Sequence, residues 1–303
     1  MHKEWQGHTG EILGSKNKFD VIECENCDFK HVVPIPTEDF LSEYYKNSFV
    51  KNRPSGFYKK MEDDVPWLEI FYNEKYDLFE KHIKKQKPSI LDIGSGLGYF
   101  IKCGKDRGWQ AIGVEPSIES YNYSKKLGLV VVNEYLDEKN YQDLGKIDVV
   151  HMHEVLEHLP DPSNMIKLAK NMLNPGGLIC IVSPNDFNPL QKAFVKIYDD
   201  EKWWISPPEH INYFDFSSIK NLLEKNGFTI VEQTSTFPLE IFLLMGENYI
   251  SNDKVGKMIH SKRVRFERNI NKNGYEEIRR NMYRKLSEIG IGREFCVIGK
   301  LCE

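Results

Sequence analysis

The chain has 303 residues, of which 40% are hydrophobic and 28% charged, as in a globular protein with one large domain or a large and a small one. No apolar stretch approaches the roughly 18 residues of a membrane span, and no apolar segment of a secretion signal follows the first basic residues, so neither membrane insertion nor secretion is expected. The net charge of -4 gives no overall field that would draw the chain onto nucleic acid, which is not an expected partner.

The cysteines indicate the compartment. Six cysteines are too few for a disulfide scaffold in a chain of this length. Cys103 and Cys180 fall within apolar periodic segments, where free thiols are commonly buried. We therefore expect a reducing environment and a cytoplasmic protein.

Residues 1–55 are expected to form a small N-terminal module. Cys24-Glu-Asn-Cys27 has the spacing of half a zinc site, and His31 after it and His8 before it would complete a tetrahedral Cys2His2 set. A structural zinc ion would then hold the module together. The alternative is a pair of reduced cysteines in a β-hairpin over residues 19–33, and the sequence leaves both interpretations open.

Residues 56–303 are expected to form the main domain, which begins with an aromatic helix over residues 57–85. Between residues 86 and 184, short β-branched runs alternate with longer segments of helical spacing, which predicts a parallel α/β sheet. The expected strands are 89–93, 111–114, 130–132, 147–151 and 178–182. The expected helices between them are 97–107, 118–126 and 164–172.

Beyond the sheet core, the pattern predicts a helix over residues 217–225 and a strand over 229–233. A last strand over 294–299 follows a helical insertion at about 240–290. Basic side chains outnumber acidic ones in this insertion, which we interpret as a solvated helix face. By its position the insertion would be either a lid over a substrate or the contact of a homodimer.

A glycine-rich turn carries the main functional signal. Ile90-Leu-Asp-Ile-Gly-Ser-Gly-Leu-Gly-Tyr-Phe100 places Gly94, Gly96 and Gly98 where a strand turns into a helix, so that a ligand can approach the backbone and the free N–H groups of the helix. Glu115 ends the next strand, where a carboxylate can meet the hydroxyls of a ribose. The third glycine comes one residue too early for a nicotinamide-binding fingerprint.

Four segments together resemble class I S-adenosylmethionine-dependent methyltransferases, of the type 11 and type 23 kind. They are Leu91-Asp-Ile-Gly-Ser-Gly-Leu-Gly98, Gly113-Val-Glu-Pro-Ser117, the run from Asp148 to Pro162, and Leu173-Asn-Pro-Gly-Gly177. The resemblance covers about residues 86–235. It implies an α/β fold with a Rossmann-like, doubly wound, seven-stranded sheet whose last strand is antiparallel.

The resemblance also implies which residues bind S-adenosylmethionine. They are Asp92, Gly94, Ser95, Gly96, Gly98 and Tyr99 around the methionine part, Glu115 and Pro116 at the ribose, Asn133 at the adenine, and His153 and Glu154 beneath the methyl group. These positions fall at the carboxyl ends of strands, where open α/β sheets bind ligands. For Asp92 and Glu115, capping of a helix is the structural alternative.

Transfer of a methyl group to a hydroxyl needs a base, for which His153, His158 and His210 are the candidates. His210 is the preferred candidate. It lies in an aromatic, proline-rich segment, Trp203 to Phe214, which we expect to wall the acceptor pocket. The same aromatic residues could instead be core packing. Some related quinone O-methyltransferases carry a Glu-x-x-Glu-His similar to the run from Glu154 to His158 and bind a divalent cation there, which is a second interpretation of these residues.

The function expected from the sequence is S-adenosylmethionine-dependent methylation of a small-molecule or saccharide acceptor at an oxygen atom. The N-terminal Cys-x-x-Cys resembles a module of sugar methyltransferases, which implies polysaccharide biosynthesis, although those modules have two such pairs and this chain has one. The alternatives are an RNA or protein methyltransferase, or a regulatory protein that binds the cofactor without catalysis.

Overall fold

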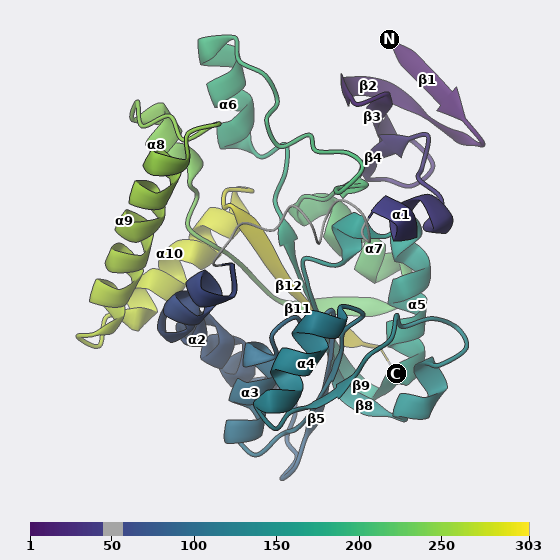
Figure 1. The fold of residues 1–303 in the computed structure, drawn as a ribbon, viewed down its shortest axis with the longest axis vertical. Coiled ribbons are helices and arrows are strands. Elements are labelled where there is room, and N and C mark those ends of the chain that lie inside the picture. Colours follow the sequence, from purple (N-terminus) through teal and green to yellow (C-terminus); the bar gives the residue numbers. More distant parts are fainter. Residues whose placement is uncertain (45–56, 303) are drawn as a thin grey trace.

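A seven-stranded sheet dominates the structure, a computed structural model that describes residues 1–44 and 57–302 (Figure 1). The boundary expected near residue 55 lies outside the described residues. The sheet order is β11-β12-β9-β8-β5-β6-β7. The strands, in chain order, are β5 (Ser89–Ile93), β6 (Gln110–Val114), β7 (Val130–Val132), β8 (Ile147–His153), β9 (Leu173–Pro184), β11 (Phe228–Ser235) and β12 (Glu294–Leu301).

The strand directions confirm the predicted fold class. β5 to β9 pair in parallel, whereas β12 is antiparallel to both β9 and β11. β12 runs backwards because the helical insertion begins and ends at the same edge of the sheet. β9 starts earlier than the predicted residue 178, since Leu173 already pairs with Ile147 before a register shift in the ladder.

Helices cover both faces of the sheet, and alternate strand residues face alternate layers. Ile90 and Val149 pack with Tyr76 of α2, whereas Leu91 and Val150 pack with Ile166 of α5. The helices of these layers are α2 (Phe57–His82) and α3 (Tyr99–Asp106) on one face, α5 (Pro162–Met172) and α7 (Phe216–Lys225) on the other, and α4 (Ile118–Lys126) beside β7. Among the described residues, no helix is long and apolar enough to cross a membrane.

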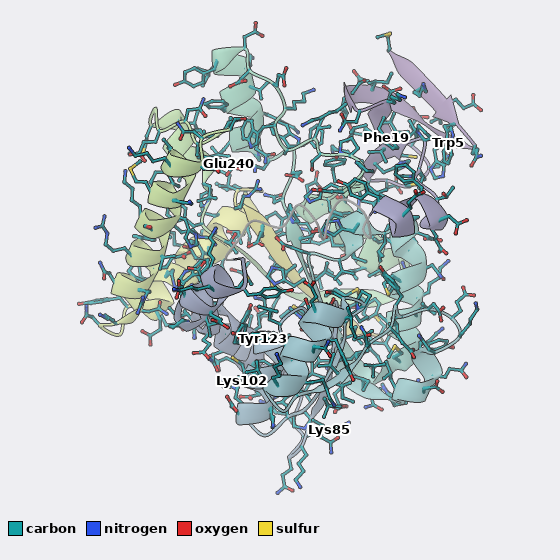
Figure 2. The ribbon with its side chains drawn as sticks, in the orientation of Figure 1. Trp5, Phe19, Lys85, Lys102, Tyr123 and Glu240 are labelled. Atoms are coloured by element: carbon teal, nitrogen blue, oxygen red, sulfur yellow. The ribbon has the colours of Figure 1, made fainter. Side chains whose placement is uncertain are left out.

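The insertion between β11 and β12 is helical, as the sequence predicts. It consists of α8 (Glu240–Leu244), α9 (Asp253–Asn271) and α10 (Glu276–Glu288), with α10 packed on β11 and α9 beside α2. Lys85, just before β5, and Glu240, just after β11, lie toward opposite ends of the molecule (Figure 2). The insertion therefore starts at the carboxyl edge of the parallel strands, where ligands of such sheets bind.

The N-terminal residues form a second, five-stranded sheet in the order β1-β2-β3-β4-β10. The hairpin expected over residues 19–33 is present, but the fifth strand comes from the main domain. Val21 and Val32 of the hairpin share a buried cluster with Trp204 and Tyr213. The elements of this region are β1 (His2–Trp5), β2 (His8–Lys16), β3 (Phe19–Cys24), β4 (Lys30–Val33), α1 (Glu38–Tyr44), α6 (Pro189–Tyr198) and β10 (Asn212–Tyr213).

Candidate active site

The glycine turn after β5 presents bare backbone to open space. Gly94, Gly96 and Gly98 have φ angles of 72°, 52° and 80°, in the left-handed region that favours glycine. A Cβ atom on Gly94 would lie 2.7 Å from Val155, and one on Gly98 would lie 2.6 Å from Leu129, whereas one on Gly96 would meet nothing within 4 Å. Residues of the same chain therefore leave no room for a side chain at Gly94 and Gly98. At Gly96 a side chain would have room, and only the positive φ angle disfavours it.

A cavity of about 510 Å³ opens beside this turn. Its walls come from the glycine turn, the ends of β8, β9 and β11, helix α2, and the insertion with the start of β12. Eight of the residues implied by the sequence line it together: Asp92, Gly94, Ser95, Gly96, Gly98, Tyr99, His153 and Glu154. The turn and the end of β8 thus face one space, as the sequence-based assignment requires.

Glu115 joins the end of β6 to the glycine turn. Its carboxylate accepts hydrogen bonds from the backbone N–H of Gly96 and of Ser117, both at 2.8 Å, and its residue surface is 7% exposed. The side-chain amide of Asn133 donates to the carbonyl oxygens of Glu115, at 2.8 Å, and Pro116, at 3.1 Å. These three residues stand beside the cavity and are not part of its described lining.

Asp92 is paired with a histidine of the neighbouring strand. His151 Nδ1 lies 2.7 Å from Asp92 Oδ1, both residues are buried, and the imidazole stacks on Phe100 with ring centroids 3.8 Å apart. Burial lowers the pKa of His151 to about 4, so the neutral ring donates its Nδ1–H to the carboxylate. His151 thus orients Asp92, and the capping alternative does not hold because the N-cap of α3 is Gly98.

His153 and Glu294 form a second pair on the cavity wall. Their Nε2 and Oε1 atoms are 3.3 Å apart. Burial by itself would lower the pKa of His153, but the hydrogen bond and the charge of Glu294 outweigh it and raise that pKa. Burial conversely opposes ionisation of Glu294, whose pKa the hydrogen bond and charge of His153 nevertheless bring down to about 2. Neighbouring Glu154 has a left-handed φ of 53°, a strained conformation of the kind that gathers at active sites.

The run from Glu154 to His158 does not converge on one metal site. Glu157 turns inward and accepts a hydrogen bond from Ser183 at 2.9 Å, and burial raises its pKa to about 8. His158 Nδ1 lies 2.7 Å from the carbonyl oxygen of Glu209. Glu154 instead groups with His153 and Glu294, whose potential ligand atoms all lie within 4.8 Å of one another.

The aromatic segment after α6 is core packing, which corrects the expectation that it walls the acceptor pocket. Trp204 and Tyr213 are 5% and 1% exposed within the cluster that joins the N-terminal sheet to the main domain. Tyr213 also accepts the backbone N–H of Ser206 at 3.1 Å. His210 packs against His158, with ring centroids 5.1 Å apart, and neither histidine belongs to the described lining of the cavity.

Sequence reasoning missed the wall formed by α2 and the insertion. Trp67 and Phe71 of α2 line the cavity together with Arg263 of α9 and Arg279 of α10. These two arginines are 9% and 0% exposed, so the solvated face expected for the insertion is wrong at both positions. The spacing of these arginines along their helices was the available signal in the sequence. Only the packing of the helices against α2 shows that these positions are buried.

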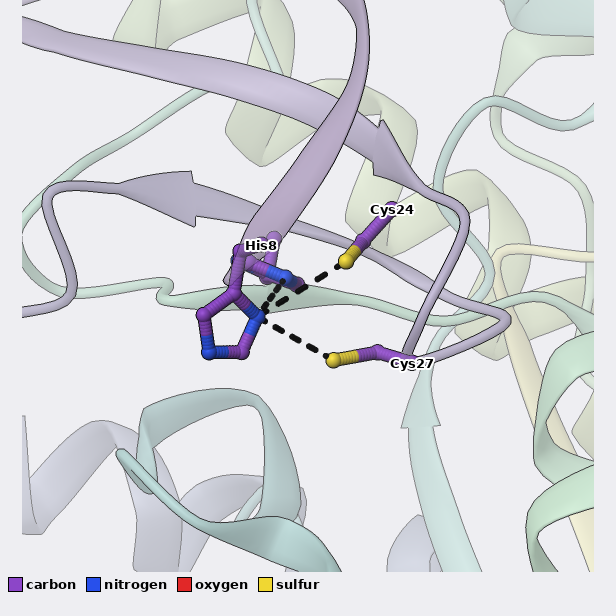
Figure 3. A group of neighbouring side chains, drawn as sticks. His8, Cys24 and Cys27 are labelled. Atoms are coloured by element: carbon purple, nitrogen blue, oxygen red, sulfur yellow. Dashed lines mark hydrogen bonds between the residues drawn. The ribbon is translucent and has the colours of Figure 1, made fainter. Parts of the chain in front are cut away.

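The four candidate metal ligands of the N-terminal sheet come together in space, and Figure 3 shows His8, Cys24 and Cys27 among them. His8 Nδ1 lies 3.3 Å from Cys27 Sγ, 3.7 Å from Cys24 Sγ and 3.2 Å from His31 Nε2. Separations of this size are those between neighbouring ligands of a tetrahedral ion whose bonds measure about 2.0–2.3 Å. The other ring nitrogen of His31 lies 2.9 Å from the carbonyl oxygen of Val32, which orients the ring.

The fold and the cavity define a class: a Rossmann-like α/β protein with a cavity beside a glycine turn on the carboxyl edge of the sheet, which is where open α/β sheets bind ligands. The sequence model of a family described as a methyltransferase domain matches residues 69–233, which is more than half of the chain. The chain therefore belongs to the methyltransferase-domain family.

Two curated relatives show what the sequence is similar to. The ubiquinone biosynthesis O-methyltransferase of Colwellia psychrerythraea is 33% identical over 96 residues, which are 30% of this chain and 39% of that protein. The protein of the same name from Escherichia fergusonii is 26% identical over 167 residues, covering 50% of this chain and 69% of that protein. The first match thus spans well under two thirds of the relative.

A solved structure shares the fold. The plantazolicin methyltransferase BpumL, in complex with a monoazolic desmethylPZN analog and SAH, superposes with a TM-score of 0.52 at 16% sequence identity. The match covers 87% of this chain and 94% of that chain. At this level of identity the likeness concerns the fold alone.

Proposed function

We propose that the protein transfers the methyl group of S-adenosylmethionine to an oxygen atom of a small molecule bound in the 510 Å³ cavity. The observation that carries this proposal is the shape of that cavity, which brings the glycine turn and the His153–Glu294 pair to one space. The names of the curated relatives, O-methyltransferases of ubiquinone biosynthesis, support oxygen as the acceptor atom.

The residues present fit the cofactor. The hydroxyl of Ser95 is buried without a hydrogen-bond partner among the described residues, and a side chain on Gly96 would project into open space. Both features suit a ligand that lies against the turn. We propose that Asp92 and residues 94–99 hold its methionine part and that Glu115, Pro116 and Asn133 border its nucleoside. When bound, S-adenosylmethionine supplies an electrophilic methyl group on a positively charged sulfur.

We propose His153 as the base that accepts the proton of an acceptor hydroxyl. Donation of its Nε2–H to Glu294 fixes the tautomer and leaves a lone pair on Nδ1, while the carboxylate stabilises the imidazolium that forms. His153 must be neutral to act, and its pKa lies above the ordinary 6.5. Turnover should therefore rise with pH through the neutral range. His158 and His210 are the other candidates from the sequence. Neither belongs to the described lining of the cavity, and we propose that both have structural roles.

Replacement of His153 tests this proposal. His153→Ala should lower turnover by about 100-fold, measured as S-adenosylhomocysteine formed from a cell metabolite extract, and leave the affinity for S-adenosylhomocysteine nearly intact. His210→Ala is the matched control and should turn over at the wild-type rate. The opposite ranking of the two variants would contradict the assignment of the base.

We also propose that one structural zinc ion binds His8, Cys24, Cys27 and His31. The converging donor atoms and the hydrogen bond that orients His31 support this site. His8 lies in β2, Cys24 and His31 lie in β3 and β4, and Cys27 lies in the turn between these two strands, so an ion between the four would tie β2 to the β3–β4 hairpin. Its role would be to stabilise a small sheet that has little core of its own.

The proposal extends to the chemical class of the methyl acceptor and to the oligomeric state of the protein. A saccharide acceptor, and with it a place in polysaccharide biosynthesis, is the second candidate for the small molecule. An RNA or protein acceptor fits a cavity of about 510 Å³ less well than a small molecule does. We propose a cytoplasmic protein that forms a homodimer through the insertion, which the exposed Met258, Phe266, Tyr275 and Ile278 support.

A further inference from the structure

The cavity contains two arginine side chains with unused hydrogen-bonding capacity. Arg263 on α9 and Arg293, directly before β12, both line it. Arg263 Nε and Arg293 Nη1 are buried and have no hydrogen-bond partner among the described residues. Buried guanidinium N–H groups without an acceptor are costly and unusual, so each points to a ligand.

The carboxylates near these arginines do not satisfy them. Glu267 Oε2 lies 3.4 Å from Arg263 Nε, but Glu267 already accepts hydrogen bonds from Trp67, at 2.7 Å, and from Tyr283, at 2.5 Å. Glu240 Oε1 is 3.9 Å from Arg293 Nη1, beyond hydrogen-bonding distance. Glu267 and Glu240 therefore offset the positive charges of the two arginines, but the N–H groups on Arg263 Nε and Arg293 Nη1 remain without an acceptor among the described residues.

Several other charged groups of the cavity are already paired. Glu74 binds Arg279 and Arg280, Asp92 binds His151, and Glu294 binds His153. Arg279 thus donates hydrogen bonds to Glu74 and Asn271, whereas the Nε–H of Arg263 on the neighbouring helix has no acceptor among the described residues. The Arg263 guanidinium lies over the ring of Trp67, with its Cζ atom 5.0 Å from the ring centroid, which holds the planar group in place.

From this arrangement we infer that Arg263 and Arg293 bind a carboxylate or phosphate group of the methyl acceptor. The inference rests on the proposed function and adds to it the charge of the substrate. Guanidinium groups suit both anions because their planar N–H donors match the oxygen geometry. The aromatic rings of Trp67 and Phe71 in the same wall provide an apolar surface for the rest of the acceptor.

Binding of small anions to the protein saturated with S-adenosylhomocysteine tests this inference. The probes are benzoate and phenyl phosphate, with benzamide as the neutral analogue of benzoate, each titrated to about 10 mM by calorimetry. Both anions should bind at least about tenfold more tightly than benzamide. Their relative affinities show whether the site prefers a carboxylate or a phosphate.

Two variants connect this binding to the residues. Arg263→Met and Arg293→Met keep most of the side-chain volume, and each should weaken the two anions about tenfold without changing the affinity for S-adenosylhomocysteine. Arg265→Met, exposed on the same helix as Arg263, is the matched control and should bind like the wild type. If Arg263→Met does not fold, Arg263→Lys keeps the charge but loses the planar donors and should also weaken both anions.

Several results would overturn the inference: no binding of either anion, equal binding of benzoate and benzamide, or unchanged anion affinity in the variants. A tenfold loss of affinity for S-adenosylhomocysteine in either variant would assign the arginine to the carboxylate of the cofactor instead. The wild-type affinity for S-adenosylhomocysteine is measured first. Its absence would refute the proposed function itself, whereas cofactor binding without anion binding refutes only the charge of the acceptor.

Discussion

Replacement of Gly96 by alanine separates ligand binding from folding at the glycine turn. The φ of 52° is strained for alanine and costs about 1 kcal/mol, which corresponds to a decrease in Tm of about 2–4 °C. The added methyl group meets no atom within 4 Å, so no packing penalty adds to this strain. It does occupy the space from which the cofactor approaches the backbone. Calorimetry with S-adenosylhomocysteine should show a loss of affinity of about tenfold or more.

Gly108, directly after α3, provides the matched control. Its φ is 85°, a Cβ atom there would also meet nothing within 4 Å, and the residue is exposed. Gly108→Ala should therefore lower the Tm by a similar amount and bind S-adenosylhomocysteine like the wild type. Equal affinities of the two alanine variants would refute the role given to Gly96. A much larger loss of Tm for Gly96→Ala would show instead that the space beside it is needed by the fold.

Three further predictions concern other parts of the chain. Burial raises the pKa of Glu157 from 4.5 to about 8, so the native state keeps a proton that the unfolded state has lost, and stability falls as pH rises through this window. The free energy of unfolding of Glu157→Gln relative to that of the wild type should therefore increase as pH rises through this window, by at most about 5 kcal/mol. The difference in Tm between the two proteins should grow in the same direction, and a pH-independent difference would contradict this. Cys24→Ser combined with Cys27→Ser should reduce bound zinc from about one ion per chain to near zero in metal analysis of protein purified without added metal, and full retention would exclude the pair as ligands. His210→Ala should lower the Tm and spare turnover, and a loss of about 100-fold at an unchanged Tm would restore it as the candidate base.

The sheet and the glycine turn could be predicted because their signals are local. Short apolar runs indicate buried strands, and the glycines at positions 94, 96 and 98 indicate backbone φ angles that other residues avoid. Three of the four candidate metal ligands were also found from spacing, because Cys24 and Cys27 lie in one hairpin and His31 follows in its second strand. Each of these features depends mainly on residues close in sequence.

Partners that lie far apart in sequence were decided by the tertiary structure alone. His153 and Glu294 are separated by 141 positions, and Trp67 and Glu267 by 200. Periodicity shows that a residue such as Arg263 recurs on one side of a helix, but it does not show whether that side meets water or another helix. The same limit applies to Tyr213, because an aromatic residue is equally suited to a core and to a substrate pocket. The sequence by itself therefore determined the fold and the position of the glycine turn, whereas the packing of α2 and the insertion against the sheet determined which other side chains line the cavity.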